Sequence, residues 1–245
     1  MSTSAHSSAP ATIHYPDSDG KPMADNTLQF QWVVTIKEGL DALFRDRPDV
    51  FVAGDLLWYP VEGNPKLCQA PDALVVFGRP KGYRGSYKQW QEGGIAPQVV
   101  FEVHSPNNRA EEMTRKALFY RRHGVEEYYL YNPENGALSG WLREGDELLE
   151  IPEPRGWTSP RLGVRFEVEG TDLRLIRPDG RCFRSYPELV EDWEREEARA
   201  EQERTRAEQE RLRAEQEHAR AEQEHARAER LAERLRAMGI DPESL

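Results

Sequence analysis

The sequence predicts a mixed α/β (α+β) domain with one mixed β-sheet and flanking helices, followed by a long charged C-terminal helix. Runs of β-branched and aromatic residues recur between residues 50 and 177, as expected of strands buried in a sheet. One segment with a helical period precedes these runs and a second lies among them. From about residue 187 onward the chain is almost entirely Arg, Glu, Gln and Ala, which favours one long helix over a second core.

The composition divides the 245 residues into four parts. Residues 1–24 are rich in Ser, Pro and Asp, and we expect a flexible leader there. Residues 25–186 hold most of the aromatic and β-branched residues and are long enough for one domain with its own core. Residues 187–238 form a charged repeat, and residues 239–245 form a short tail.

The domain begins with a helix predicted over residues 26–45, where apolar residues recur every three or four positions. Three strands follow, each an apolar run bounded by turn residues: 50–59, 71–78 and 98–105. A long loop, residues 79–97, joins the second of these strands to the third. It contains Gly, Lys and aromatic residues.

The second predicted helix begins near Asn108, which can cap it together with Glu111, and ends at Gly124. Residues 127–133 form a fourth strand. The alternating stretches that follow, up to about residue 177, predict a β-meander with Asn-Gly and Gly-Asp turns. A crossover helix between strands, followed by further strands, is typical of an α/β or α+β sheet domain.

The C-terminal part repeats every seven residues, as in RAEQERT, RAEQERL and RAEQEHA. Its small and apolar residues lie two and five apart, and not three and four apart as a coiled-coil seam requires. Its charges can pair along one helix, as Arg206 can with Glu210. The sequence predicts a long helix and leaves two forms open: a solitary charged helix, or a coiled coil through Leu231, Leu235 and Met238.

Charge and cysteine content exclude several classes of protein. The net charge of −11 argues against nonspecific coating of nucleic acid, which depends on Lys and Arg, but it allows a local basic cleft. Cys68 and Cys182 are too few for a disulfide scaffold or a zinc cluster. The N-terminus has no apolar signal region and no stretch reaches the length of a membrane span. We therefore expect a cytoplasmic protein without a membrane partner.

The functional prediction depends on Asp72, Glu102 and Lys116. Both carboxylates lie in strands that are otherwise apolar, where a charge is costly unless it is paired or holds a metal. Lys116 lies on the helix that follows the strand of Glu102. Carboxylates bind a hard divalent cation, and a lysine can act on the scissile phosphate or the attacking water. This combination is what a metal-dependent phosphodiesterase requires.

Four neighbouring features have open roles. His104 shares a strand face with the carboxylate two residues before it, where a common nuclease arrangement has lysine. Asp55 is either a further acid near the metal or a turn residue. Glu112, one helical turn before Lys116, can pair with it. The basic and aromatic loop 79–97 either contacts nucleic acid or packs its Trp on the core.

The segments PDALVVFG, RGSYKQWQEGG, VVFEVHSPN and RRHGVEEYYLYNP resemble the Uma-type restriction endonuclease family of the PD-(D/E)XK nuclease superfamily. The resemblance covers about residues 15–180. It implies a restriction-endonuclease-like core that binds Mg²⁺ and cuts DNA, with Asp72 and Glu102 as metal ligands and Lys116 as a relocated catalytic lysine. The chain departs from the family pattern at Asn108, where Thr is usual, and at Glu112, where Asp is usual.

We predict a metal-dependent endonuclease that hydrolyses phosphodiester bonds in nucleic acid, with double-stranded DNA as the expected substrate. Asp72, Glu102 and the Val103 carbonyl would hold one or two Mg²⁺ ions, with Mn²⁺ as a substitute. The competing prediction is a catalytically weak nuclease-fold interaction module whose helical tail binds a partner. His104 and the acidic net charge favour that alternative. The sequence leaves open whether the protein is a homodimer, through the nuclease domain or the C-terminal helix.

Overall fold

The structure is a computed structural model, and it describes residues 13–239 apart from the side chain of Leu235. Contacts between residues divide the chain into two units, Met1–Tyr186 and Pro187–Leu245. The first unit contains all the strands, and the second contains nearly all of one long helix. The expected tail over residues 239–245 lies outside the described residues, except for Gly239.

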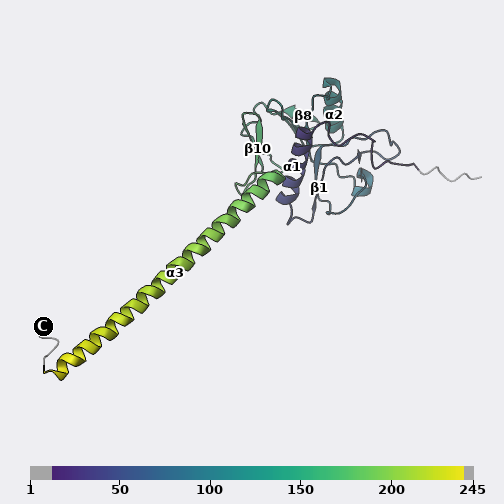
Figure 1. Ribbon diagram of the computed structural model, residues 1–245. Helices are drawn as coiled ribbons and strands as arrows, with labels where there is room; N and C mark the ends of the chain where they lie inside the picture. The colour runs from purple at the N-terminus through teal and green to yellow at the C-terminus, as the bar shows by residue number, and fades with distance from the viewer. Residues whose placement is uncertain (1–12, 240–245) are drawn as a thin grey trace, which may run out of the picture. The chain divides into compact units, whose positions relative to one another are not determined.

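The first unit is built on a six-stranded mixed sheet with the strand order β1-β3-β5-β6-β7-β8. Figure 1 labels its two edge strands, β1 and β8. Its strands are β1 (Val50–Ala53), β3 (Ala73–Phe77), β5 (Val99–Val103), β6 (Glu127–Asn132), β7 (Ala137–Glu144) and β8 (Glu147–Glu150). All neighbours are antiparallel except β5 and β6, which are parallel and are joined by helix α2 (Ala110–Arg122). The mixed α/β sheet domain predicted from the sequence is confirmed.

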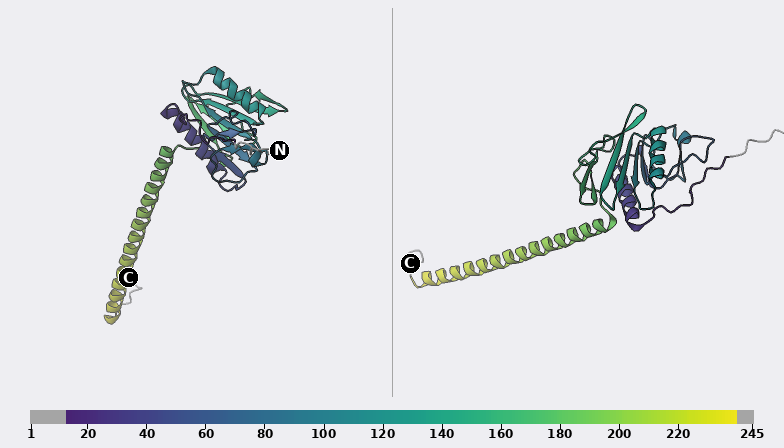
Figure 2. Two further views of the ribbon diagram at one scale, coloured as in Figure 1. Left: turned by 90° about the vertical axis from the view of Figure 1, so that its right-hand side faces the viewer. Right: turned by 90° about the horizontal axis from the view of Figure 1, so that it is seen from above.

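Two apolar cores cover the two faces of this sheet, because successive strand residues point to opposite sides. On one face, α1 (Thr27–Leu43) packs together with β9 (Arg165–Glu169) and β10 (Asp172–Ile176), which form an antiparallel pair. On the other face lie α2 and the short parallel pair β2 (Trp58–Tyr59) and β4 (Tyr87–Lys88). Figure 2 shows the sheet between these layers.

The helix ends show where local sequence decides the structure and where it does not. Asn26 caps α1, since its side-chain oxygen accepts from the Gln29 N–H at 2.8 Å. The predicted cap of α2 is wrong: its N-cap is Arg109, which makes no side-chain capping bond. The Asn108 side chain instead accepts from the Ser105 N–H at 2.8 Å, which holds the turn after β5. Because the Asn108 side chain is bound to the Ser105 N–H, it does not cap α2, and the N-cap is one residue later than predicted.

The strand predicted over residues 50–59 is two strands. β1 ends at Ala53, and Asp55 has a φ of 48°, a left-handed conformation that residues other than glycine adopt at a cost. This turn carries the chain out of the main sheet, so that Trp58 and Tyr59 pair with β4. In loop 79–97, β4 is followed by the short 3₁₀ helix η1 (Gln89–Glu92).

Part of the expected leader packs on the domain. Residues 1–12 lie outside the described residues, but the Tyr15 ring lies against Tyr59 and Trp90, with centroid distances of 5.2 and 5.0 Å. The Asp17 carboxylate accepts from the Ser86 hydroxyl at 2.9 Å. The Ser-, Pro- and Asp-rich composition indicated a flexible segment, but it could not indicate these contacts with residues far along the chain.

The second unit consists of α3 (Tyr186–Ala237), a helix of 52 residues that begins at the unit boundary. Ion pairs four residues apart run along it, among them Arg206–Glu210 at 3.1 Å. Leu231 and Met238 are 60% and 74% exposed in this single chain, while the Leu235 side chain is outside the described residues. No helix in the described part of the chain is both long and apolar enough to cross a membrane.

A buried carboxylate links the sheet to the segment before β9. Glu127 is fully buried and accepts hydrogen bonds from the Ser159 hydroxyl, the Tyr129 hydroxyl at 2.9 Å and the Arg161 N–H at 2.7 Å. Burial raises the pKa of Glu127 above its usual value, although these three donors lower it. The ionised form is therefore less stable in the folded protein than in the unfolded chain.

We expect Glu127→Gln to change how stability depends on pH. A raised pKa means that wild type loses folding free energy as pH rises from the unfolded pKa of about 4.3 through the folded pKa. The variant lacks this loss, although its amide facing the Arg161 N–H costs about 1–3 kcal/mol at every pH. The stability of the variant relative to wild type should rise between pH 4 and 7 (roughly), as measured by urea unfolding. The exposed Glu150→Gln is the control, and parallel wild-type and Glu127→Gln curves would contradict the expectation.

Candidate active site

The centre of the site is Glu102, a carboxylate within β5 that is 1% exposed. Its Oε2 atom accepts from the Lys116 ammonium, with 2.7 Å between Nζ and Oε2. Its Oε1 atom accepts from the Tyr120 hydroxyl. Lys116 and Tyr120 are four residues apart on α2, so both point from one helix face toward the strand. The helix thus supplies the partners that a buried charge needs.

Asp72 stands beside this pair, one residue before β3, and is 8% exposed. Its Oδ2 atom accepts from the Val103 N–H at 2.6 Å, which joins the start of β3 to the end of β5. Burial raises the pKa of Asp72 well above its usual value, and the nearby Glu102 charge raises it further. The Lys116 charge opposes this shift but does not cancel it.

Lys116 keeps its proton in this environment. Burial lowers the pKa of its ammonium, but the charges of Glu102 and Asp72 outweigh burial, so the pKa lies above the usual value. A lysine with a raised pKa is a poor general base at neutral pH. It remains a cation that can donate hydrogen bonds and stabilise negative charge.

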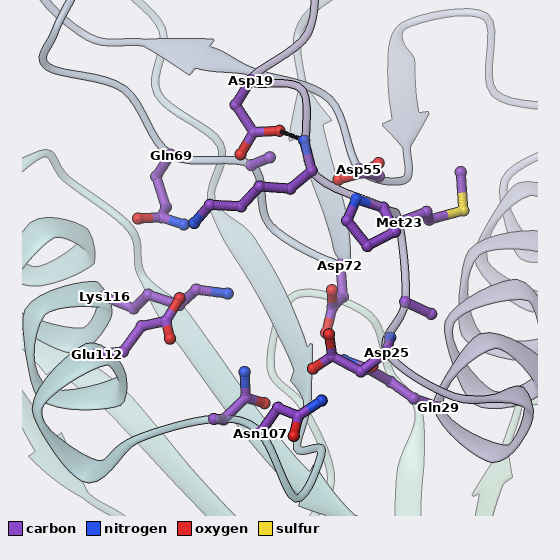
Figure 3. Close-up of a pocket in the computed structure, with 15 residues that line it drawn as sticks. Asp19, Met23, Asp25, Gln29, Asp55, Gln69, Asp72, Asn107, Glu112 and Lys116 are labelled. Atoms are coloured by element: carbon purple, nitrogen blue, oxygen red, sulfur yellow. Dashed lines mark hydrogen bonds between the residues drawn. The ribbon is translucent and has the colours of Figure 1, made fainter.

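Asp72 and Lys116 line one cavity of about 230 Å³, as Figure 3 shows. Glu102 does not line it but lies one hydrogen bond away through Lys116. One wall is formed by α2 through Glu112 and Lys116, and another by the N-terminal segment from Asp19 to Asp25. The three residues predicted from the sequence therefore meet in one place.

The residues whose roles were left open are placed as follows. Asp55 lines the cavity in its left-handed turn, and burial raises the pKa of its carboxyl. Glu112 also lines the cavity. His104 is turned toward Asn132, whose side-chain nitrogen is 3.4 Å from Nδ1, and does not line the cavity. The Val103 carbonyl accepts from the Gln29 side-chain amide at 2.9 Å, which leaves it one further lone pair.

Sequence reasoning missed Tyr120 and Gln29. Tyr120 follows Lys116 by four residues, and this spacing alone could have indicated a second group on the same helix face. Gln29 lies on α1 and reaches the Val103 carbonyl across 74 residues of sequence. No local signal could have found that contact.

Loop 79–97 has fewer free charges than its sequence indicates. Arg79 and Arg84 both pair with Glu92, at 2.7 Å each, and the Arg84 guanidinium lies 4.0 Å from the Phe51 ring centroid. These two arginines stabilise the loop itself. Tyr83 is 96% exposed, while Trp90 is half-buried against Tyr15.

The donor atoms at the site suit a hydrated Mg²⁺ ion. They are carboxylate oxygens, with the Val103 carbonyl adjacent. Mg²⁺ is usually held by one or two carboxylates and keeps several waters, whereas a structural zinc site needs four His, Cys or carboxylate ligands. Within residues 13–239 no group of three or more His, Cys, Asp or Glu residues has the geometry of a metal site.

Comparison with known proteins gives one family and a structural neighbour. Residues 31–174 match the model of the Uma2 family, described as "Putative restriction endonuclease". A crystal structure described as a putative nuclease from Anabaena variabilis aligns with 57% of this chain and 74% of its own, at 16% identity and a TM-score of 0.43. No curated protein gives a significant match. Because the family match spans more than half of the chain, the protein belongs to the Uma2 family.

Proposed function

We propose that the protein is an endonuclease that hydrolyses phosphodiester bonds in nucleic acid with the help of Mg²⁺, and that its substrate is DNA. The observation that carries this proposal is the contact between Lys116 Nζ and Glu102 Oε2 at 2.7 Å, beside the buried Asp72 carboxylate. Membership of a family described as restriction endonucleases supports the same reaction class. A buried acid–lysine pair with a raised lysine pKa beside a polar cavity is typical of a functional site.

Asp72 and Glu102 are the residues that would hold the metal, with the Val103 carbonyl as a further oxygen donor. When bound, Mg²⁺ supplies positive charge at the scissile phosphate and lowers the pKa of a bound water. Burial raises the pKa of Asp72 and repulsion from Glu102 raises it further, and a cation at this place would relieve that repulsion. Mn²⁺ has similar ligand preferences and is a reasonable substitute.

Lys116 acts in this proposal as a fixed positive charge. Its raised pKa keeps the ammonium protonated, so it would donate hydrogen bonds to the phosphate oxygens or to the attacking water. Glu102 holds the Lys116 ammonium in place, and the Tyr120 hydroxyl in turn holds the Glu102 carboxylate. The proton of the attacking water would pass to one of the carboxylates that line the cavity, and not to Lys116.

One observation favours a second function, an interaction module with little or no catalysis. Both Glu102 oxygens already accept hydrogen bonds, from Lys116 and from Tyr120, so a metal would compete with existing partners. In the nuclease, Lys116 must release Glu102 or share it when Mg²⁺ binds. Calorimetric titration with Mg²⁺ separates the two functions, since an interaction module has no need of a metal site.

We expect Lys116→Met and Glu102→Gln each to lower plasmid nicking by about 100-fold or more. The reason is the loss of charge stabilisation in the transition state for Lys116, and the loss of a metal ligand for Glu102. The measurement is the rate of nicking of supercoiled plasmid with Mg²⁺ or Mn²⁺. Lys66→Met, at an exposed lysine, is the matched control and should cut like wild type. Undiminished cutting by both site variants would remove the proposal.

We expect Tyr120→Phe to lower Mg²⁺ affinity about tenfold, because the hydroxyl fixes Glu102 Oε1 and second partners of metal ligands have effects of this size. Calorimetric titration measures the affinity. Tyr128→Phe is the matched control: Tyr128 is also a buried tyrosine of this core, and it packs flat on Trp141 at 4.7 Å. Equal affinities for Tyr120→Phe and Tyr128→Phe would show that the hydroxyl has no such role.

Mg²⁺ should raise the melting temperature of wild type but not of Glu102→Gln.

We expect a chain truncated after Tyr186 to keep its metal-dependent nicking. The repeat between Glu188 and Met238 has interleaved charges and no cluster that could bind a phosphate. Sedimentation of the full-length and truncated chains tests the homodimer. Equal numbers of chains per particle would mean that the helix is solitary, and a smaller number after truncation would mean that the helix pairs the chains. Loss of cutting would show that the helix completes the enzyme.

The cytoplasmic location stays a prediction.

A further inference from the structure

We propose that Tyr59, Ser86, Lys88 and Trp90 form a binding site for an unpaired nucleotide, and that residues 15–17 of the chain itself occupy this site in the structure. We call these four residues the Trp90 surface. The inference deepens the proposed function, because it gives the substrate a single-stranded portion next to the cavity. Three kinds of contact with residues 15–17 support it.

An aromatic ring occupies the site where a base would lie. The Tyr15 ring contacts both Tyr59 and Trp90, at centroid distances of 5.2 and 5.0 Å and interplanar angles of 77° and 53°. The Lys88 ammonium is 5.7 Å from the centre of the Tyr15 ring. Aromatic side chains together with a cation are the usual platform for a base of any sequence. The Tyr15 hydroxyl also accepts from the Gly63 N–H at 2.5 Å, as a polar group on a base could.

A carboxylate occupies the site where a phosphate would lie. Asp17 accepts from the Ser86 hydroxyl at 2.9 Å. Its Oδ2 atom lies only 2.5 Å from the place where a side chain on Gly85 would begin, so only glycine allows this approach. Between the ring and the carboxylate, the Pro16 carbonyl accepts from the Tyr59 hydroxyl at 2.7 Å. A ring, a polar link and an anion in succession match the groups of one nucleotide.

The occupying segment leads directly into the candidate active site. From Asp17 the chain continues to Asp19 and Asp25, which line the cavity together with Asp72 and Lys116 (Figure 3). At the far end the Asp25 carboxylate accepts from the Ser105 hydroxyl, two residues after β5. A single strand that replaced the segment on the Trp90 surface would therefore pass beside Lys116.

The segment is suited to being displaced. Residues 16–23 are all exposed, so few apolar contacts hold them, and such segments open at low free-energy cost. Their acidic groups repel a polyanion, so nucleic acid and this segment cannot share the site. Nucleic acid can bind only those molecules in which the segment is displaced. The apparent affinity of the site is therefore its intrinsic affinity multiplied by the displaced fraction.

The test measures binding of a short fluorescein-labelled oligothymidylate to the full chain by fluorescence anisotropy, with EDTA present so that nothing is cut. We expect the double variant Tyr15→Ser/Asp17→Ser to bind about tenfold more tightly than wild type, the size of one stacked base. Adding Trp90→Ala should remove the gain. An oligonucleotide of abasic sites should show a clearly smaller gain, because it has phosphates to replace Asp17 but no ring to replace Tyr15.

Two controls separate this site from general effects. Asp46→Ser removes one negative charge at a side chain that is 86% exposed, and it should bind like wild type. His14→Ser/Ser18→Ala alters the same segment beside the contact residues and should also bind like wild type. Melting temperatures check that each variant is folded. If the double variant is unfolded, Tyr15→Ser alone replaces it.

No gain in a folded variant, or an equal gain with the abasic chain, overturns the inference. Its failure is distinct from failure of the proposed function, because binding is measured without metal and cutting in a separate assay. A gain in binding without any nicking would leave the nucleotide site and remove the nuclease. Nicking without a gain in binding would leave the nuclease and remove the nucleotide site.

Discussion

The charge of Glu102 constrains the domain more than any other single group. Its side chain is 1% exposed in a strand whose every residue is buried, where an unpaired charge would cost several kcal/mol. Lys116 and Tyr120 satisfy both of its oxygens from α2. Tyr120 is itself part of the apolar core between α2 and the sheet. The position of α2 and the geometry of the site therefore depend on the same two contacts.

The balance of charge around the cavity is the consequence of this arrangement. Its lining contains the carboxylates of Asp19, Asp25, Asp55, Asp72 and Glu112, but the only lysines among the lining residues are Lys21 and Lys116. Lys116 is paired with Glu102, and its single positive charge offsets the other carboxylates only in part. The raised pKa of Asp72, caused by burial and by Glu102, reflects this surplus of negative charge. In the proposed function, a bound cation would relieve this surplus.

The sequence predicted most of the strands, the crossover helix and the meeting of Asp72, Glu102 and Lys116 in one place, because these depend on local pattern and on the cost of a charge in an apolar strand. It could not predict what depends on distant partners. The cap of α2 went to Arg109 because Asn108 bonds to Ser105. The expected strand over 50–59 bends at Asp55, whose N–H bonds to the Pro71 carbonyl at 3.0 Å. In both places a contact outside the local pattern decided the structure.

The acidic cavity also limits the order of events in the proposed reaction. A phosphodiester brings a negative charge to a site that already has a surplus of carboxylates, and two arginines of loop 79–97, Arg79 and Arg84, are paired with Glu92. Nucleic acid alone would be repelled at the short distances involved. In the proposed reaction, metal binding in the cavity would therefore precede or accompany entry of the scissile phosphate, whereas the Trp90 surface, whose residues do not line the cavity, would bind an unpaired base without metal. The N-terminal segment, whose Asp19 and Asp25 add to the surplus, has to leave in the same step.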